Sequence, residues 1–447
     1  MRRRLLLSLW NAGLAIALAT PAAAQSPLSL ADAIDAAMGR NPALRAARAS
    51  GQEAREVSRA ARAERFPRIH FSETWRRSTQ PVAGFGSLLN AGRFTTEDFA
   101  VSRLNAPGAV NGFSRRVYLS NVLFDGGRTR ALVTISTRQA DAADAARQAA
   151  EADLAWRVTE QYGRVAAATA HVTAAQAAST WAGEDRSRAD ARRRAGTATD
   201  ADVLTASVLV ADMQQRLIQA EGDLVAARAA LNSLMGAPLD GTFTVALPPV
   251  PSQTPTLADL TSTARAERAE LRDATQAVAA AEAGIRLARA SFAPAIAADA
   301  GYEWNGIDVG GRQSSWSVGA ELRWSLSTGG AEAARAAAAR LGVEAARASR
   351  DAAIAAIDLD VVTTRQQWIV ALARMDASRV TAEQARESQR IIRQRYAAGM
   401  ASMTDVLAAA SAAFAADAQE TANRVGTVTA WAALQRSVGR SFFSATR

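Results

Sequence analysis

Apolar and polar residues alternate along two segments in the second half of the chain, residues 296–304 and 315–326. The apolar positions are Ile296, Ala298, Ala300, Tyr302 and Trp304 in the first segment, and Trp316, Val318, Ala320, Leu322, Trp324 and Leu326 in the second. Alternation with period two over about ten residues, with aromatics near the ends, is typical of membrane β-barrel strands. A soluble hairpin with one buried face is the alternative interpretation.

A less regular strand pair is predicted in the first half of the chain. Ile69, Phe71 and Trp75 share one face, but Glu73 lies on the same face. The partner strand is predicted from about residue 116 to Phe124. Between them, roughly residues 77–114 are rich in Gly, Asn and Ser, which predicts an extracellular loop much longer than its counterpart at 305–313.

Two very long helices follow these strand pairs. Residues 108–237 and 295–447 contain no proline, and a proline inside a helix costs ~3 kcal/mol. The helices are predicted to run from Gly126-Gly127 to Gly196 and from Gly329-Gly330 to Gly399. Each would be about 100 Å long, which is too long for an ordinary globular domain and indicates a coiled-coil-like assembly.

The helix that returns from Gly196 carries a heptad pattern. One seam position is occupied by Val203, Val210, Leu217, Leu224 and Leu231, and the other by Ala206, Met213, Ala220, Ala227 and Leu234. Five consecutive heptads predict left-handed supercoiling against a neighbouring helix, and alanine at many seam positions permits close approach.

The chain is an internal duplication. Leu30-Ala31-Asp32 recurs as Leu257-Ala258-Asp259, and Pro67 recurs as Pro294 at the same offset. At a second constant offset, Gly126-Gly127 recurs as Gly329-Gly330, and Gly196 with Asp202-Val203-Leu204 recurs as Gly399 with Asp405-Val406-Leu407. Repeats at constant spacing indicate repeated structural units. We expect a first repeat at 25–237, a Pro-rich linker at 238–255, a second repeat at 256–440 and a C-terminal tail at 441–447.

Residues 1–24 have the pattern of a signal peptide. Three arginines precede an apolar run, and Pro21-Ala22-Ala23-Ala24 resembles a processing site. The run is shorter than the roughly 20 apolar residues of a membrane anchor, so cleavage on export is expected, with an uncleaved anchor as the alternative. The chain has no cysteine, which excludes disulfides. Its net charge of +9 comes from arginines that mostly stand beside acids, so no nucleic-acid partner is expected.

Four strands cannot close a barrel, and an open sheet edge is not tolerated in hydrocarbon because its backbone groups stay unpaired. Other copies of the chain must therefore complete the wall. Eight-stranded barrels are filled by side chains, so a conducting pore favours three copies over two.

The chain resembles TolC-type outer membrane efflux proteins across nearly its whole mature length. The resemblance rests on Ser29-Leu30-Ala31-Asp32-Ala33-Ile34 with Asn41-Pro42, on Pro67 and Pro294, on Leu123-Phe124-Asp125-Gly126-Gly127-Arg128, and on the paired segments after Gly196 and Gly399. It implies an α+β membrane protein with four β-strands per protomer in a twelve-stranded trimeric β-barrel, continued by a long coiled-coil α-helical barrel.

The resemblance also implies the function and the partners. A homotrimer in the cell outer membrane, with its helical barrel in the periplasm, would dock with a periplasmic adaptor protein and an inner-membrane pump. It would passively conduct drugs, other small solutes or proteins, as in tripartite efflux or type I secretion. It implies no enzymatic chemistry and no cofactor.

The resemblance places two functional regions in this sequence. The helix turns at Arg194, Gly196, Thr197, Gly399 and Met400 would form the periplasmic tips that contact the adaptor. Nearby arginines could pair with adaptor carboxylates, or with acids of their own helices on a solvated face. Those arginines are Arg192, Arg193, Arg194, Arg393 and Arg395.

Asp405, with Asp202 at the duplicate position, would line the periplasmic aperture. Three like charges at a constriction would attract cations and repel anions; the alternative is that each aspartate only stabilises its helix N-terminus. The sequence departs from the family at Ala408, where a second acid is usual, and at Ala401, where an arginine helps to latch the closed form.

One other class of protein remains as an alternative. A periplasmic coiled-coil adaptor or scaffold would explain the helices but not the strand pairs. An enzyme is not expected, because His70 and His171 have no acid or nucleophile at a consistent spacing, and neither a phosphate-binding glycine loop nor a metal-ligand cluster is visible.

Overall fold

The computed structural model describes residues 27–249, 251 and 254–440. The predicted signal peptide and C-terminal tail lie outside the described residues. The chain divides into two compact units: unit 1 comprises Met1–Gly39, Val158–Val250 and Arg374–Thr429, and unit 2 comprises Arg40–Arg157, Pro251–Ala373 and Ala430–Arg447. Each unit is described by itself.

The internal duplication is visible in the lengths of the helices. In the first repeat, α1 (Leu30–Arg40), α2 (Pro42–Ala63) and α5 (Arg128–Arg194) have 11, 22 and 67 residues. In the second, α7 (Leu257–Glu267), α8 (Ala269–Ala290) and α9 (Ala331–Ala397) have the same three lengths. The returning helices α6 (Asp200–Met235) and α10 (Met403–Ser437) have 36 and 35 residues. The predicted two-fold repeat is confirmed.

The first short helix ends just before the Asn41-Pro42 pair. Asn41 caps α2 by accepting a hydrogen bond from the Leu44 amide at 3.1 Å, and Pro42 occupies the first helical position, where its missing amide costs nothing. The second repeat makes the same break at Arg268. This buried side chain instead pairs with Asp360 at 2.7 Å and donates to the Ser437 carbonyl at 3.1 Å.

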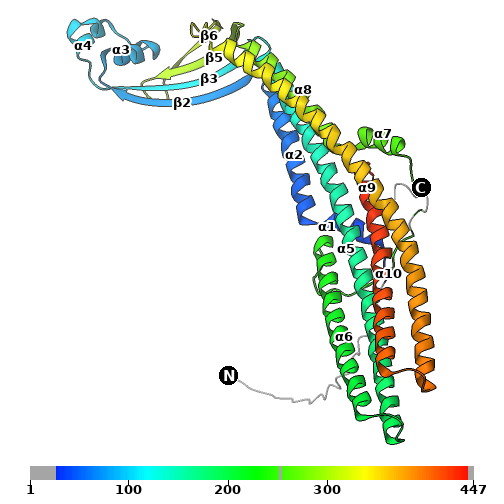
Figure 1. Ribbon diagram of the computed structural model, residues 1–447. Helices are drawn as coiled ribbons and strands as arrows, with labels where there is room; N and C mark the ends of the chain where they lie inside the picture. The colour runs from blue at the N-terminus through cyan, green and yellow to red at the C-terminus, as the bar shows by residue number, and fades with distance from the viewer. Residues whose placement is uncertain (1–26, 250, 252–253, 441–447) are drawn as a thin grey trace, which may run out of the picture. The chain divides into compact units, whose positions relative to one another are not determined.

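Unit 1 contains the ends of the four long helices, which run alongside one another (Figure 1). The predicted heptad seam of α6 is confirmed, because all ten of its positions are buried or half-buried. The facing seam of α5 consists of alanines seven residues apart, at Ala168, Ala175, Ala182 and Ala189, which are all buried. Small side chains on both helices allow close packing. Two short parallel strands, β1 (Pro27–Leu28) and β4 (Thr244–Val245), complete unit 1.

Unit 2 contains a four-stranded antiparallel sheet in the order β2-β3-β5-β6. Its strands are β2 (Arg68–Ser78), β3 (Val110–Phe124), β5 (Ala295–Gly306) and β6 (Arg312–Arg323). β3 begins six residues earlier than predicted, because the cross-strand ladder with β2 continues from Ser120 to Val110. β6 ends before Trp324, whose indole nitrogen donates to the Phe292 carbonyl at 3.2 Å.

The predicted long loop between the first two strands is folded. Residues 79–109 form α3 (Pro81–Asn90), the 3-10 turn η1 (Thr96–Phe99) and α4 (Val101–Asn105). The composition rich in Gly, Asn and Ser concealed these short helices. We call residues 79–109 the exit insert.

Alternate residues point to opposite sides, which gives the sheet a mainly apolar face and a polar face. The mainly apolar face also carries Glu73, which pairs with Arg115 at 2.6 Å and with Arg312 at 2.7 Å. Cross-strand register brings the two faces into rows. The apolar row contains Ile69, Phe71, Trp75, Phe113, Val117, Leu119, Ala300, Tyr302, Trp304, Trp316, Val318 and Leu322. The polar row contains His70, Ser72, Thr74, Ser114, Arg116, Tyr118, Ser120, Asp299, Glu303, Asn305, Gln313, Ser315 and Ser317. Most of the large apolar side chains are exposed on this isolated chain.

Within the described residues, none of the helices has a stretch both long enough and apolar enough to span a lipid bilayer.

Candidate functional site

The two helix turns of unit 1 have the same backbone design. Gly196 and Gly399 follow α5 and α9 with φ of 71° and 76°, a region in which side chains are strained. Each turn makes the hydrogen-bond pair of a Schellman motif. The Gly196 amide binds the Arg193 carbonyl and the Thr197 amide binds that of Arg192, at 3.0 and 2.9 Å. Gly399 and Met400 repeat this pattern at 3.0 and 2.8 Å. The duplicated glycines therefore end the helices because the turn requires a positive φ at these positions.

Asp202 and Asp405 form capping boxes at the N-termini of α6 and α10, the helices that follow the two turns. The Asp202 carboxylate accepts from the amide and the hydroxyl of Thr199 at 2.9 and 2.8 Å. Asp405 accepts from the same two groups of Ser402 at 2.9 and 2.7 Å. These hydrogen bonds from the Ser402 and Thr199 hydroxyl and amide groups lower the pKa of both aspartates. Each carboxylate thus stabilises its helix N-terminus locally, and Asp405 is also exposed.

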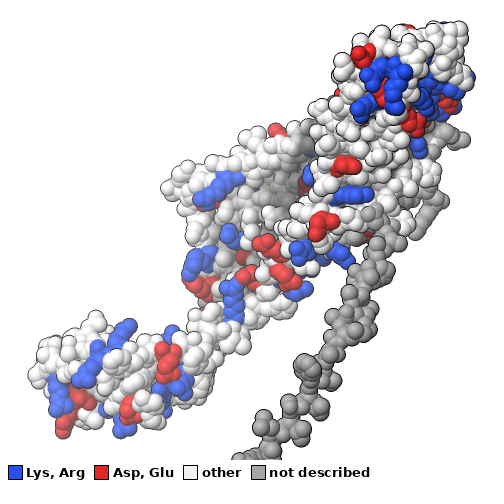
Figure 2. All heavy atoms as spheres, turned by 90° about the horizontal axis from the view of Figure 1, so that it is seen from below, with Lys and Arg blue, Asp and Glu red and all other residues white. Residues whose placement is uncertain are grey.

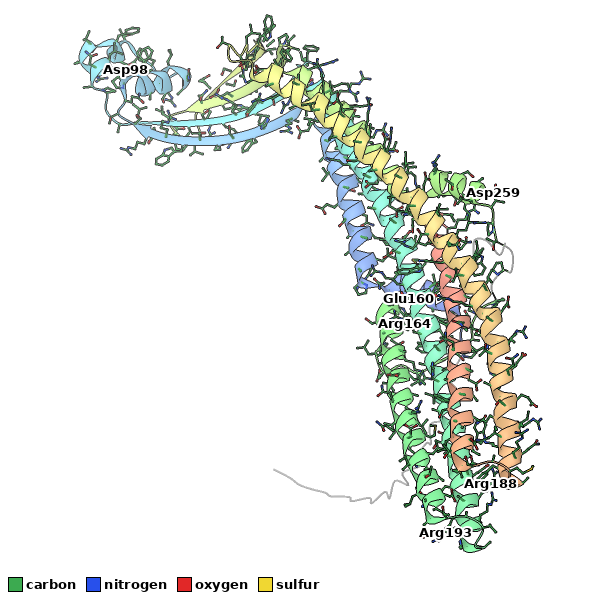
Figure 3. The ribbon with its side chains drawn as sticks, viewed as in Figure 1. Asp98, Glu160, Arg164, Arg188, Arg193 and Asp259 are labelled. Carbon is green, nitrogen blue, oxygen red and sulfur yellow. The ribbon has the colours of Figure 1, made fainter. Side chains whose placement is uncertain are left out.

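The arginines at the end of α5 differ in their partners. Arg193 pairs with Asp190 at 3.0 Å and with Asp200 at 3.2 Å, and Arg194 pairs with Asp190 at 2.5 Å. These pairs lie on an exposed surface at the end of α5, where Figure 3 labels Arg188 and Arg193. Basic and acidic side chains are interspersed on the face seen in Figure 2. Exposed pairs of this kind contribute about 0–1 kcal/mol each.

Arg192 instead connects the two helix turns. Its Nη1 donates to the Tyr396 carbonyl at 2.9 Å, and its guanidinium lies 4.9 Å from the centre of the Tyr396 ring. Its Nη2 is 3.8 Å from where a Cβ on Gly399 would be. A small apolar core joins the same ends: Ala189, Ala206, Met403 and Val406 are buried together, with Val203, Ile392, Tyr396 and Leu407 packed against them. The residues predicted at the tips therefore lie at one end of unit 1.

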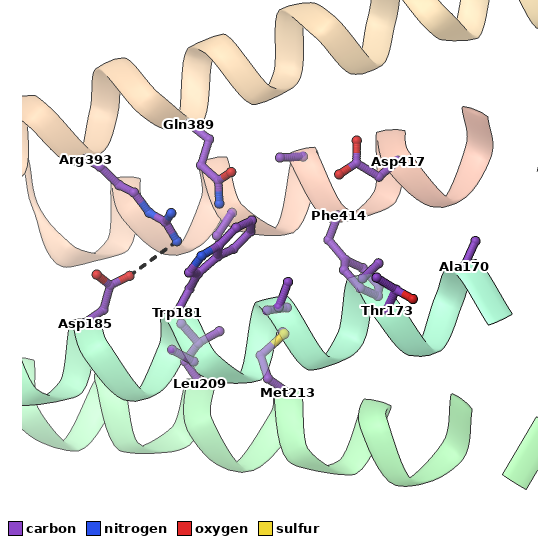
Figure 4. Close-up of a pocket in the computed structure, with 16 residues that line it drawn as sticks. Ala170, Thr173, Trp181, Asp185, Leu209, Met213, Gln389, Arg393, Phe414 and Asp417 are labelled. Carbon is purple, nitrogen blue, oxygen red and sulfur yellow. Dashed lines mark ion pairs between the residues drawn. The ribbon is translucent and has the colours of Figure 1, made fainter. Parts of the chain in front are cut away.

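A cavity of about 420 Å³ lies deeper in unit 1, between all four helices (Figure 4). Seven alanines line it, together with Trp181, Met213 and Phe414 among other residues. At one end Asp185 forms an ion pair with Arg393 at 3.6 Å, and the Arg393 guanidinium lies 5.0 Å from the centre of the Trp181 ring. Asp185 is only 6% exposed, and its burial raises the pKa of the carboxyl, against the lowering effect of Arg393 and Arg188.

Sequence reasoning missed Tyr396, Trp181 and Asp185. Trp181 and Asp185 are four residues apart and therefore lie on the same helix face, next to the buried alanine seam of α5 at Ala182 and Ala189. That spacing could have indicated that Trp181 and Asp185 lie beside the helix-packing surface. Arg393 could not be paired with Trp181 and Asp185 from sequence, nor Tyr396 with Arg192, because the partners lie some 200 residues apart.

His70 lies in the sheet and contacts residues of the neighbouring strand. His70 stacks on Tyr118 with ring centres 4.4 Å apart, and its Nε2 is 3.2 Å from the Ser120 hydroxyl on the polar face of the sheet. Among the described residues, no three His, Asp or Glu side chains gather as a metal site.

The outer membrane efflux protein family matches residues 33–237 and 260–440, which together are most of the chain. A search of curated protein sequences finds no match.

Solved structures with the same fold include outer-membrane channels. A membrane protein from Pseudomonas aeruginosa is 21% identical, with a TM-score of 0.78 over 93% of this chain and 91% of that one. VceC from Vibrio cholerae is 19% identical, with a TM-score of 0.76 over 92% and 96%. The open state of MtrE from Neisseria gonorrhoeae is 20% identical, with a TM-score of 0.76 over 92% and 89%.

The family match spans both repeats, and the structural matches agree on the fold of long helices with few strands. The chain belongs to the outer membrane efflux protein family and is an outer-membrane channel component of efflux systems.

Proposed function

We propose that three copies of this chain form one channel, in which twelve strands make the outer-membrane wall and twelve long helices make the periplasmic tunnel. The observation that carries this proposal is the incomplete sheet of unit 2. Its outer strands β2 and β6 present unpaired edges in the described chain, and its apolar face is exposed. The open edges are not stable alone in a membrane, because they leave backbone groups unsatisfied in hydrocarbon. The apolar face is unfavourable in water and suits lipid.

The polar face of the sheet supports a water-filled interior. Arg116 pairs with Glu303 at 2.8 Å across neighbouring strands, and the Ser114 hydroxyl donates to the same carboxylate at 2.6 Å. A row of charged and hydroxyl groups opposite an apolar face is the pattern of a lumen wall. The lipid partner of the apolar face is the outer membrane.

Unit 1 supports assembly as well. α6 exposes a second apolar stripe, opposite its buried seam, at Leu204, Val208, Ile218 and Val225, which are 67–71% exposed. Leu204, Ile218 and Val225 follow heptad spacing, so a helix of a second copy can pack against this stripe. An uncovered stripe of this size would favour association in water.

The test measures the mass and the conductance of the detergent-solubilised protein. Native mass spectrometry is expected to give three copies, and planar bilayers are expected to show discrete channels. A stable monomer from the soluble periplasmic fraction would reject the channel and would favour the adaptor or scaffold interpretation.

We infer that the helix turns of unit 1 are the contact for a periplasmic adaptor. Members of this family work with an adaptor and an inner-membrane pump. Arg193 and Arg194 already have partners within this chain, whereas Met400 is 73% exposed. The adaptor contact is therefore proposed to rest on Thr197, Met400 and the glycine backbones more than on arginine charge.

Photo-crosslinking tests this contact in cells. A photoreactive residue at Met400 or Thr197 is expected to trap the adaptor, and one at Val309, which is exposed in unit 2, serves as the control. Equal trapping at Val309 would contradict the assignment.

The cargo is proposed to be small solutes delivered by an efflux pump, with no chemistry in the channel. Protein export by a type I secretion system is the second candidate, since the proposed tunnel would serve either pump. Deletion of the gene is expected to increase drug susceptibility. Unchanged susceptibility together with loss of a secreted protein would favour export.

A further inference from the structure

The exit insert is a folded element and differs from the connection at the equivalent place in the second repeat. β2 and β3 are joined by residues 79–109, whereas β5 and β6 are joined by residues 307–311. Helices attach to the sheet at the opposite end, since α2 precedes β2 and α5 follows β3. The exit insert and the short turn therefore lie at the end of the sheet away from the helices.

The exit insert has a small core of its own. Phe94 makes edge-to-face contacts with Phe85 and Phe99, with ring centres 4.7 and 5.1 Å apart. Asp98, labelled in Figure 3, closes a capping box with Thr95, whose amide donates to it at 3.0 Å. Arg103 pairs with Asp98 at 3.4 Å. These contacts give the segment a defined shape.

The exit insert lies on the polar face of the sheet. Gly112 on β3 is on the same side as Ser114 and Arg116, because strand residues alternate. A Cβ placed on Gly112 would lie 2.8 Å from the Ser87 hydroxyl of α3. The missing side chain therefore leaves the space that Ser87 occupies.

The exit insert also reaches the far strand of the sheet. A Cβ placed on Gly92 would lie 3.0 Å from Cγ of Gln313, which lies on the polar face of β6. Its neighbour Arg93 reaches the short turn, where Nη2 is 3.2 Å from a Cβ placed on Gly311. The Asp308 carboxylate accepts from the Gly311 and Gly310 amides, which with Arg93 and Arg312 lower its pKa. The exit insert therefore extends from β3 to the turn before β6.

We propose that the exit insert is the outer constriction of the channel and limits the size of solute that leaves it. This inference rests on the proposed function, in which the polar face lines a trimeric pore. Each of the three copies would then hold one exit insert over its third of the wall, so that cargo must pass between them.

The dimensions of the parts make this constriction severe. With strands about 4.8 Å apart and tilted by about 40°, a twelve-stranded wall has a backbone radius of roughly 12 Å. A helix with its side chains is about 10 Å across. Three helices lying on the inner face would therefore fill most of the radius at the exit, whereas a five-residue turn would leave it open.

The main test replaces the exit insert, residues 79–109, by a copy of the short turn, residues 307–311, in the full-length chain. Purified trimers are compared in planar bilayers by single-channel conductance and by the largest polyethylene glycol that enters. The shortened protein is expected to conduct at least several-fold more and to admit larger polymers. Equal conductance and an equal size limit would overturn the inference, while the proposed channel would stand. If neither protein formed channels, the proposed function would fail together with the inference.

A second variant tests the placement of the exit insert without shortening it. The chain has no cysteine, and a Cβ on Gly112 would be 3.5 Å from that of Ser87, which suits a disulfide. S87C/G112C is expected to form an intramolecular disulfide in the purified trimer, shown by loss of thiol labelling, and to conduct like the unmodified protein. S87C/F113C is the control, because Phe113 faces the opposite side of the sheet. A bond in the control pair alone, or in neither pair, would overturn the inference.

Discussion

Arg192 at the end of α5 donates a hydrogen bond of 2.9 Å to the carbonyl of Tyr396 at the end of α9 and lies over its ring. Carbonyls at the end of a helix lack partners within the helix and attract cations. The Tyr396 carbonyl also accepts from the Gly399 amide at 3.0 Å, so Arg192 adds a second, charged donor to it and joins the two helix turns of unit 1.

Removing Arg192 should loosen the two turns from each other. Arg192→Ala loses a charged hydrogen bond and a cation–π contact, together about 1–3 kcal/mol. Limited proteolysis of the trimer is expected to cut faster at residues 195–199 and 398–402. Arg194→Ala is the control, because its pair with Asp190 is exposed and within one helix. Equal cleavage of the two variants would show that the contact between the turns carries no stability.

Asp405 and Asp202 allow a controlled test of the aperture. Both make the same capping box from the third helical position, so replacing either by asparagine should lower helix stability by a similar amount. If Asp405 lines the constriction, Asp405→Asn should lower cation selectivity, measured as a reversal potential in a salt gradient. Asp202→Asn should change it less, since that residue is half-buried. A shift of equal size in both variants would contradict an aperture role specific to Asp405.

The pH dependence of these two caps follows from their lowered pKa. Hydrogen bonds from the Ser402 and Thr199 groups favour the charged carboxylates. Their contribution to stability is therefore present above the unfolded pKa of about 3.9. It is lost as the pH falls through the lower folded pKa. Cation selectivity due to Asp405 is expected to persist at pH 5, and its disappearance there would contradict this assignment of the charge.

The contribution of Asp185 to stability should depend on pH in the opposite direction. Burial raises its pKa in the folded state, so protonation favours folding. Its contribution is fully present below about pH 3.9 and is lost as the pH rises through the folded pKa. Asp185→Asn keeps the size of the side chain without the charge. The variant is expected to gain thermal stability relative to the unmodified protein at pH 7 and not at pH 4. Melting curves by circular dichroism measure this difference, and a constant difference across pH would argue against a buried carboxylate.

The duplicated turn glycines should not tolerate a side chain. Gly196→Ala or Gly399→Ala forces a side chain into positive φ and is expected to cost about 1–2 kcal/mol. Gly183 is the matched control, because it lies inside α5 and no atom lies within 4 Å of the position that a Cβ would take. Gly183→Ala should stabilise the helix by about 0.5–1 kcal/mol. Opposite shifts in melting temperature are therefore expected, and shifts of the same sign would contradict the turn geometry.

Local chemistry in the sequence determined most of the secondary structure. The proline-free stretches, the turn glycines and the heptads of residues 203–234 act over a few residues, so they predicted helices of some 65 residues where the structure has 67. Alternation predicted the strands of the second repeat to within a few residues. The folded exit insert was not predicted, because helices of five to ten residues leave little periodicity in a stretch rich in glycine.

Only the tertiary structure decided which distant residues meet. Arg192 with Tyr396, Asp185 with Arg393, and Ser87 with Gly112 are pairs between separate elements, and nothing in local periodicity relates one member to the other. The side of the sheet on which the exit insert lies depends on strand register and on one missing side chain at Gly112. The sequence by itself determined how long each element is and which face is apolar, because these depend on neighbours along the chain. The tertiary structure decided the contacts at both ends of the helices and strands, because these depend on close packing between elements.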